Sequence, residues 1–245
     1  MFEFSQIGVI HSCFKEKFGV ARQSLMMSQA LGVLKLDPNP AFSLAVKDLE
    51  GFSHVWVLYV FHKNIETPWH PTVNPPRLDG PNRVGVFASR SPHRPNPIGQ
   101  SALKLERIDL VAKNGIEIHV SGLDILDGSP LLDIKPYLSY ADSIPEAKSG
   151  WAINAIPKYP VTFSSRSLSA IKQSATSQHP DLKELLVQML ELDPRPTSQR
   201  QALPIIEPES EGRKFAFRLF DFDVQWQIVD QGIHVVDLIS PRFKQ

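Results

Sequence analysis

The stretch SHVWVLYVF at Ser53–Phe61 gives the clearest strand signal in the chain, because nearly every position is β-branched, aromatic or aliphatic. An apolar run of this length predicts a strand that is buried on both faces. Weaker strand patterns lie on either side of it, at Phe4–His11 and Arg83–Ala88. The N-terminal part of the chain is therefore expected to be built mainly from strands.

Two alternating segments continue this pattern toward the middle of the chain. In Ser101–Ile108 leucines alternate with charged residues, and Ile116–Val120 alternates in the same way. Asp127-Gly128 is a turn signal between two such runs. Many short strands separated by turn residues predict a small, closed or nearly closed β-barrel.

The character of the sequence changes after about Asp142. Ser164–Gln173 and Leu182–Leu192 show the three- and four-residue spacing of amphipathic helices. Lys214–Val229 alternates like one long strand, and Gly232–Leu238 is predicted to pair with it. The chain is thus predicted to be mainly β, with a β-barrel domain over residues 1–145 and a small appended α+β domain over residues 155–245.

The composition is that of a globular protein. Of 245 residues 42% are hydrophobic, and the 26 Lys and Arg residues balance the 26 Asp and Glu residues. A net charge of zero gives no case for bulk nucleic-acid binding, although a local basic patch remains open. Cys13 is the single cysteine, so no intrachain disulfide is possible, which is typical of a reducing compartment. With no signal peptide and no apolar stretch of ~20 residues, we expect a cytoplasmic protein without a membrane span.

The loop SRSPHRPNPIG at Ser89–Gly99 is the first candidate site. Arg90 and Arg94 lie on a backbone stiffened by three prolines. The guanidinium group suits a carboxylate or phosphate, and a stiff loop loses less entropy when it binds. The alternative is a surface loop with two solvated arginines. We favour a site for an anionic or polar ligand, because rigidity and donors coincide.

The segment SGLDILDGSPLLDI at Ser121–Ile134 is the second candidate. Asp124, Asp127 and Asp133 stand among apolar residues. Such carboxylates can bind ribose hydroxyls, accept protons or cap backbone N–H groups. An ordinary turn, with Asp124 as a local cap, explains them equally well. The residues alone leave these alternatives open.

Several common chemistries lack a signal in the sequence. No GxGxxG follows a strand, and no P-loop, HExxH or GxSxG motif occurs. One cysteine and unpaired histidines give no zinc pattern. We therefore expect neither a Rossmann nucleotide site nor a metal site.

Taken together, the two candidate segments resemble the TsaA-like (TrmO) family of S-adenosylmethionine-dependent tRNA methyltransferases. The resemblance extends over essentially the whole chain and includes the C-terminal domain of the bacterial members. Besides SRSPHRPNPIG and GLDILDGSPLLDIKPYL, it rests on KEKFGVARQ, GFSHVWVLYVFH, PPRLDG, DPRP at Asp193–Pro196, and FDFDVQW.

The resemblance implies a β-barrel that binds S-adenosylmethionine and works as a homodimer. It also implies that the substrate is the N6-threonylcarbamoyladenosine just 3′ of the anticodon in threonine tRNA, which receives a further methyl group on N6. The residues that match the family's cofactor contacts are Ala21, Arg22, Gln23, Phe61, His62, Lys63, Arg90, Asp124, Ile125, Leu126 and Asp127.

The residues suggest how such a reaction would run. Methyl transfer from a sulfonium is an in-line displacement that needs no metal, so positioning supplies much of the acceleration. A general base would help by removing the N6 proton, and Asp127, Asp124 and His62 are the candidates. Arg94 suits the carboxylate of the threonyl group. Arg77 and Lys63 are candidates for contacts with anticodon-loop phosphates.

Two other classes of function compete with this one. A non-enzymatic RNA-binding barrel would bind RNA but no S-adenosylmethionine. A hydrolase using Asp124 and Asp127 with a metal would lose activity to a chelator. Cofactor binding and chelator sensitivity discriminate the three classes.

Overall fold

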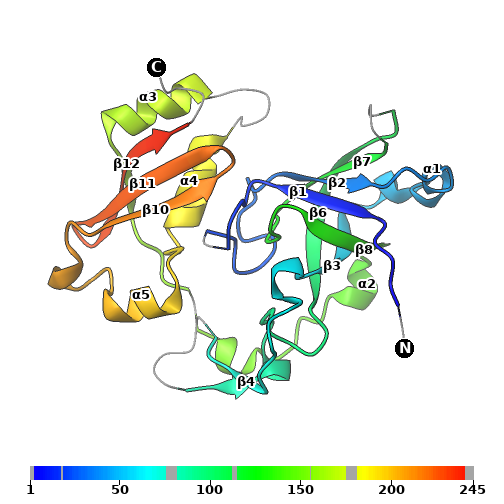
Figure 1. The fold of residues 1–245 in the computed structure, drawn as a ribbon, viewed down its shortest axis with the longest axis horizontal. Coiled ribbons are helices and arrows are strands. Elements are labelled where there is room, and N and C mark those ends of the chain that lie inside the picture. The colour runs from blue at the N-terminus through cyan, green and yellow to red at the C-terminus, as the bar shows by residue number, and fades with distance from the viewer. Residues whose placement is uncertain are drawn as a thin grey trace.

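The fold is known from a computed structural model. It describes residues 3–17, 19–75, 82–111, 115–154, 156–174 and 181–240. Figure 1 shows a β-barrel beside a second, smaller domain with its own sheet and helices. The predicted mainly β fold with an appended α+β domain is confirmed.

Six strands close the barrel in the order β1-β2-β7-β6-β3-β8, and every neighbouring pair is antiparallel. Aliphatic side chains fill its interior: Ile10, Leu34, Val55, Leu103 and Ile118 have no exposed surface. The strands are β1 Gly8–Ser12, β2 Gly32–Leu36, β3 His54–Val60, β6 Ile98–Asp109, β7 Glu117–Ser121 and β8 Ser129–Pro136.

Strand β3 differs from its prediction in one respect. Val55, Val57 and Tyr59 are buried, but the alternate residues, Trp56 among them, are only half-buried. Its outer face is therefore not core, although most of its residues are apolar. This face becomes one wall of the cavity described below.

Two other predictions in the barrel domain need correction. The expected strand at Arg83–Ala88 is only the two-residue β5, Val84–Gly85, which pairs with β4, Thr72–Val73, and passes into a 3-10 turn. Because this segment lies outside the barrel, no barrel strand pairs with it to form a longer hydrogen-bonded ladder. Asp127-Gly128 forms a turn, with Gly128 at φ +77°, but it joins no hairpin because β7 and β8 are not neighbours.

Short helical segments join the strands of this domain. They are α1 Phe42–Ala45, α2 Ser139–Asp142 and 3-10 turns at Leu49–Gly51, His62–Asn64, Val86–Ala88 and Gly150–Ala152.

The C-terminal domain has a four-stranded sheet in the order β10-β11-β12-β9, in which β9 runs parallel to β12. The predicted single strand Lys214–Val229 is instead a hairpin, because Phe220 adopts φ +52° and turns the chain. The elements are β9 Val161–Phe163, α3 Ser165–Ser174, α4 Leu182–Leu190, α5 Thr197–Ala202, a 3-10 turn Pro208–Ser210, β10 Lys214–Leu219, β11 Phe222–Val229 and β12 Gly232–Ile239.

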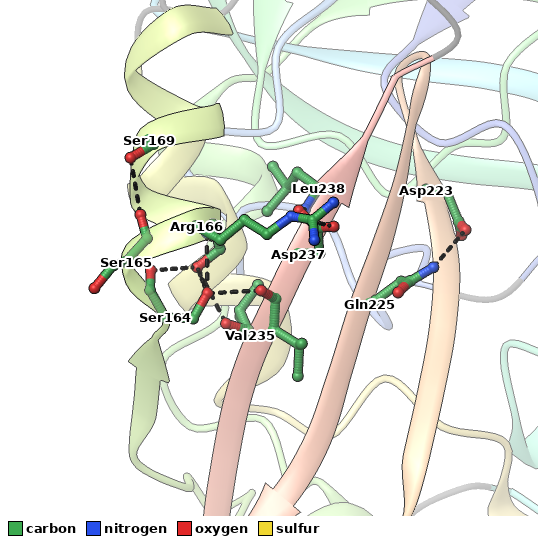
Figure 2. Close-up of polar contacts among 11 residues, drawn as sticks. Ser164, Ser165, Arg166, Ser169, Asp223, Gln225, Val235, Asp237 and Leu238 are labelled. Carbon is green, nitrogen blue, oxygen red and sulfur yellow. Dashed lines mark hydrogen bonds and ion pairs between the residues drawn. The ribbon is translucent and has the colours of Figure 1, made fainter. Parts of the chain in front are cut away.

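Side chains at the start of α3 fasten this helix to β12, as Figure 2 shows. Ser164 Oγ donates to the Val236 carbonyl at 2.6 Å. At the second residue of the helix, Arg166 Nε lies 2.9 Å from Asp237 Oδ2. Because Asp237 is 6% exposed, this pair neutralises a carboxylate at the edge of the domain core.

The two domains share one continuous hydrophobic core. The segment between β1 and β2 is their junction: the Phe220 amide donates to the Cys13 carbonyl at 2.8 Å, and Gln188 Oε1 in α4 accepts from the Gln29 amide at 3.2 Å. In Figure 1, α4 lies on the side of the C-terminal sheet that faces the barrel. The C-terminal domain is thus docked on residues on both sides of the predicted cofactor segment Ala21–Gln23.

Candidate functional site

An open cavity of about 1180 Å³ lies against the half-exposed face of β3 and β6. Its other walls are the segment Val20–Leu25, which follows β1, and the proline-rich loop that precedes β6. Protein sites for small molecules are typically ~300–1,000 Å³, so this volume has room for a cofactor and part of a second ligand.

The proline-rich loop contributes both of its arginines to the cavity, as predicted. Arg90 Nη1 donates a hydrogen bond to Gln23 Oε1 and so bridges the loop to the opposite wall. Arg94 Nη1 donates to the Ser89 carbonyl at 3.3 Å, which leans its side chain along its own loop. The loop therefore presents two guanidinium groups in defined and different positions.

Asp124 lies where the Val20–Leu25 segment approaches the barrel. Its Oδ1 accepts a 2.6 Å hydrogen bond from Ser101 Oγ in β6. Burial raises the pKa of Asp124 from 3.8 to about 6, although hydrogen bonds from Ser101 and the backbone of Ser24, and the nearby charge of Arg90, oppose the shift. A carboxylate that takes up a proton just below neutral pH can act as a general base at pH 7.

Tyr59 lies beside this carboxylate. Burial, and then the negative charge of Asp124, raise the pKa of Tyr59, so its hydroxyl stays protonated at any physiological pH. Its ring lies over Gly99, the residue opposite it in β6; a Cβ at Gly99 would approach the ring to 2.3 Å. The glycine in the predicted loop thus admits a tyrosine ring of the protein itself.

Aromatic residues form the remaining wall. The rings of Trp56 and Tyr137 are 5.6 Å apart, and Phe61 meets Tyr59 edge-on at 5.2 Å. Apolar faces beside arginines and a carboxylate suit a ligand that carries both an aromatic ring and charge.

The predicted site residues divide into two groups. Those that line the cavity are Ala21, Arg22, Gln23, Phe61, Arg90, Arg94 and Asp124. Those that are not among its described lining residues are His62, Lys63, Ile125, Leu126 and Asp127. Arg77, the candidate for a phosphate contact, lies outside the described residues.

Asp127 has structural partners of its own. Its carboxylate accepts from the Ser12 amide at 2.8 Å and lies 2.7 Å from Lys15 Nζ. His62 Nδ1 is 3.3 Å from Ser129 Oγ, and burial lowers the pKa of His62, so the ring is neutral at pH 7. Ile125 is core, and its carbonyl accepts from Ser12 Oγ. These residues brace the turn that carries Asp124.

Sequence reasoning missed Ser101, Tyr59, Trp56 and Tyr137. Ser101 carried a usable signal: it is a small polar residue at an inward-facing position of an alternating strand, and it is 2% exposed. The aromatic residues carried no such signal, because an apolar side chain is predicted to be core from the sequence whether it contacts protein or a ligand.

Neither a metal-binding cluster nor a membrane-spanning helix occurs among the residues that the structure describes. No three His, Cys, Asp or Glu side chains gather closely enough there to hold a metal ion. In the same part of the chain, every helix is too short or too polar to cross a membrane.

Comparison with known proteins covers nearly the whole chain. Residues 9–143 match the tRNA-methyltransferase O N-terminal domain, and residues 156–241 match the TrmO C-terminal domain. The tRNA (adenine(37)-N6)-methyltransferase of Escherichia coli K12 is 41% identical over 244 residues, which are 98% of this chain and 99% of the relative.

Two further matches, one to a sequence and one to a solved structure, come from Pseudomonas aeruginosa. RcsF, whose name describes an S-adenosylmethionine-dependent methyltransferase, is 41% identical over 91% of this chain and 90% of its own. The crystal structure of TrmO from this organism matches with a TM-score of 0.79 at 36% identity, over 98% of this chain and 99% of that one.

Proposed function

Because the chain belongs to the TrmO family of tRNA methyltransferases, we propose that it methylates N6 of N6-threonylcarbamoyladenosine 3′ of the anticodon in threonine tRNA. The methyl donor is S-adenosylmethionine. One observation carries the proposal for the site: two arginines and a half-buried carboxylate with a pKa of about 6 converge on one open cavity with aromatic walls.

The cavity fits the methyl donor in size and in chemistry. Its aromatic wall suits an adenine ring, and Arg90 suits the carboxylate of the amino-acid part. The backbone of Ala21–Gln23 and the side chain of Phe61 complete the proposed contacts. When bound, S-adenosylmethionine supplies an electrophilic methyl group on a sulfonium.

Asp124 is the proposed general base. It lines the cavity and its pKa lies near the operating pH, where a base is most effective. Asp127 is paired with Lys15 and the Ser12 amide, and His62 is not among the described lining residues. We assign both to bracing the Asp124 turn and the strand end beside it.

Arg94 is proposed to hold the carboxylate of the threonyl group. Its 3.3 Å bond to the Ser89 carbonyl uses one N–H of Nη1 and leaves donors on the other guanidinium nitrogen for a ligand. Arg90 and Arg94 would then do separate work from one loop, Arg90 on the methyl donor and Arg94 on the tRNA.

Mass spectrometry of nucleosides from threonine tRNA tests the activity. Incubation with the protein and methyl-labelled S-adenosylmethionine should convert N6-threonylcarbamoyladenosine to its N6-methyl derivative. Absence of the labelled product, or of any S-adenosylmethionine binding by calorimetry, would favour the non-enzymatic RNA-binding barrel.

Two arginine variants test the division of work. Arg90→Ala should weaken S-adenosylmethionine binding, whereas Arg94→Ala should leave that binding intact and raise the KM for modified tRNA. Normal turnover of modified tRNA by Arg94→Ala would refute the carboxylate contact.

We further propose that the protein acts as a homodimer in the cytoplasm, where its tRNA substrate would be met. Light scattering coupled to size-exclusion chromatography tests the assembly: a mass of twice 27.5 kDa is expected, and a mass of 27.5 kDa would refute it.

A further inference from the structure

The structure assigns a positioning role to a buried ion pair in the C-terminal domain: we propose that Asp193 and Arg195 hold the cofactor segment Ala21–Gln23 in place through Arg22. Both belong to the DPRP motif, which is part of the family resemblance but to which the sequence alone assigns no function. The inference rests on the proposed function only in that the ligand of the cavity is S-adenosylmethionine.

Arg22 is the first link. One guanidinium nitrogen, Nη2, donates to the carbonyl of Leu192 at 3.0 Å and to that of Asp193 at 2.8 Å. These acceptors lie about 170 positions away in sequence and in the other domain. A residue of the cavity wall is thus turned toward the C-terminal domain and fastened there by main-chain oxygens.

The turn that offers these carbonyls is held by the buried pair. Arg195 Nε and Nη2 each lie 2.7 Å from one oxygen of the Asp193 carboxylate, in the two-pronged geometry that only arginine provides. Arg195 Nη1 donates to the Leu203 carbonyl at 2.8 Å. The Asp193 side chain is 5% exposed and the Arg195 side chain is 2% exposed. All three guanidinium nitrogens therefore have acceptors within the C-terminal domain, two of them on the carboxylate of the turn.

The backbone at this turn needs such support. Asp193 adopts φ +51°, in the left-handed region that costs a residue with a Cβ about 1 kcal/mol. The carboxylate of the same residue, locked by Arg195, fixes this conformation and with it the direction of the carbonyl that receives Arg22. The Arg195 side chain is 2% exposed, and each of its nitrogens already has an acceptor within the domain, so the pair fits positioning better than direct contact with a tRNA phosphate.

The link continues on the other side of the segment. Gln23, next to Arg22, accepts the hydrogen bond from Arg90 of the proline-rich loop. The C-terminal turn, the cofactor segment and the loop thus form one chain of contacts, so loosening the turn should loosen two walls of the cavity.

Calorimetric titration of the full-length protein with S-adenosylmethionine, without tRNA, tests this. Arg22→Met removes the first link. The double substitution Asp193→Asn with Arg195→Met removes both charges of the pair together, which avoids leaving one of them buried alone. Each should weaken binding about tenfold, in the range of coupling between linked sites.

Combining all three substitutions separates a positioning role from direct contact. If Arg22 acts only through the turn, the triple variant binds within about twofold of either parent, because the second change breaks a chain already broken. A loss of about a hundredfold, the product of the two, would show that Arg22 contacts the ligand directly and would overturn the inference. Unchanged binding by the Asp193→Asn/Arg195→Met variant would overturn it as well.

A matched control lies in the same domain. Arg166 and Asp237, the pair in Figure 2, join α3 to β12. Arg166→Met with Asp237→Asn should leave binding within about twofold of wild type. An equal loss in this control would mean that general loosening of the domain, and not the turn, weakens the site.

Hydrogen exchange of the amides of Val20–Leu25 gives a readout that needs no ligand and no activity. Exchange there should be faster in Arg22→Met and in the milder Arg195→Lys, which keeps the charge but loses the fork. Unchanged exchange in both would refute the inference. Wild-type protein that binds no S-adenosylmethionine would count against the proposed function alone, because the exchange experiment still decides the positioning role.

Discussion

Replacing Asp124 by asparagine should make the protein more stable relative to wild type as the pH rises, and should at the same time slow methyl transfer. The folded protein raises the pKa of this carboxyl from 3.8 to about 6. Because the folded state holds the proton more tightly than the unfolded state, ionisation costs folding free energy. That cost is absent below pH 3.8, grows as the pH rises toward 6, and is constant above it.

The size of this effect follows from the two pKa values. A change from 3.8 to about 6 corresponds to about 3 kcal/mol, of which about 2–3 kcal/mol develops between pH 4 and pH 7.5. Asparagine cannot ionise, so its variant lacks this decline. The free energy of unfolding of the variant, relative to wild type, should therefore rise by about 2–3 kcal/mol over that range, whatever constant difference the amide itself introduces.

Urea denaturation of both proteins at pH 4, 5, 6 and 7.5 measures the difference directly. In parallel, initial rates of methyl transfer to modified tRNA should fall by about 10²–10⁴ in the variant, because a general base contributes that much. Wild-type kcat/KM should rise with pH up to about 6. A stability difference that does not change with pH would refute the burial argument, and a variant of normal kcat would refute the base assignment.

Three further predictions concern single residues. Gly99→Ala should cost about 1–3 kcal/mol of unfolding free energy and weaken S-adenosylmethionine binding, because the new methyl group would displace the ring of Tyr59. Urea denaturation measures the first effect and calorimetry the second, and unchanged values would mean that the ring moves aside freely. Asp127→Ala should lower the unfolding free energy by about 1–2 kcal/mol, because the Ser12 amide loses its acceptor, but should keep kcat within a few-fold of wild type. A folded variant with no turnover would show that Asp127 is the base. Gln231→Gly should raise the unfolding free energy by about 0.5–1 kcal/mol, because Gln231 adopts φ +57° in a two-residue hairpin turn where glycine is unstrained. Thermal denaturation measures this, and a lower thermal midpoint in the variant would contradict it.

The sequence predicted most of the barrel strands, although not β2, but it did not reveal the roles of their two faces. Ser53–Phe61 was predicted as a strand from its residue types, and β3 is there. Its half-exposed face lines a cavity with apolar residues, and local sequence cannot tell an apolar residue that waits for a ligand from one that meets a neighbouring strand.

The hairpin in the C-terminal sheet shows a signal that was present but overlooked. In β10 the buried residues are the odd-numbered Phe217 and Leu219, whereas in β11 they are the even-numbered Phe222, Val224 and others. This change of parity marks the turn at Phe220, a bulky residue that gives none of the usual signs of one.

Asp124 and Asp127 show where sequence reasoning stops at the site. Both are carboxylates three positions apart among apolar neighbours. Only tertiary structure places Ser101 and Arg90 near the first, and Lys15 and the Ser12 amide on the second. The difference in role comes from residues more than 10 positions away, which no local pattern contains.

The position of the site follows from the size of the barrel. Six strands enclose a core in which Ile10, Leu34, Leu103 and similar side chains have no exposed surface, and a barrel of this size has room for side chains but not for a cofactor. A site on such a barrel must be built on its outer face, from loops that the closed sheet does not itself stabilise. Here prolines stiffen one of those loops, and the C-terminal domain fastens the other through Arg22. Bracing by a second domain is therefore expected to matter most for the cofactor segment, since that segment contains no proline of its own.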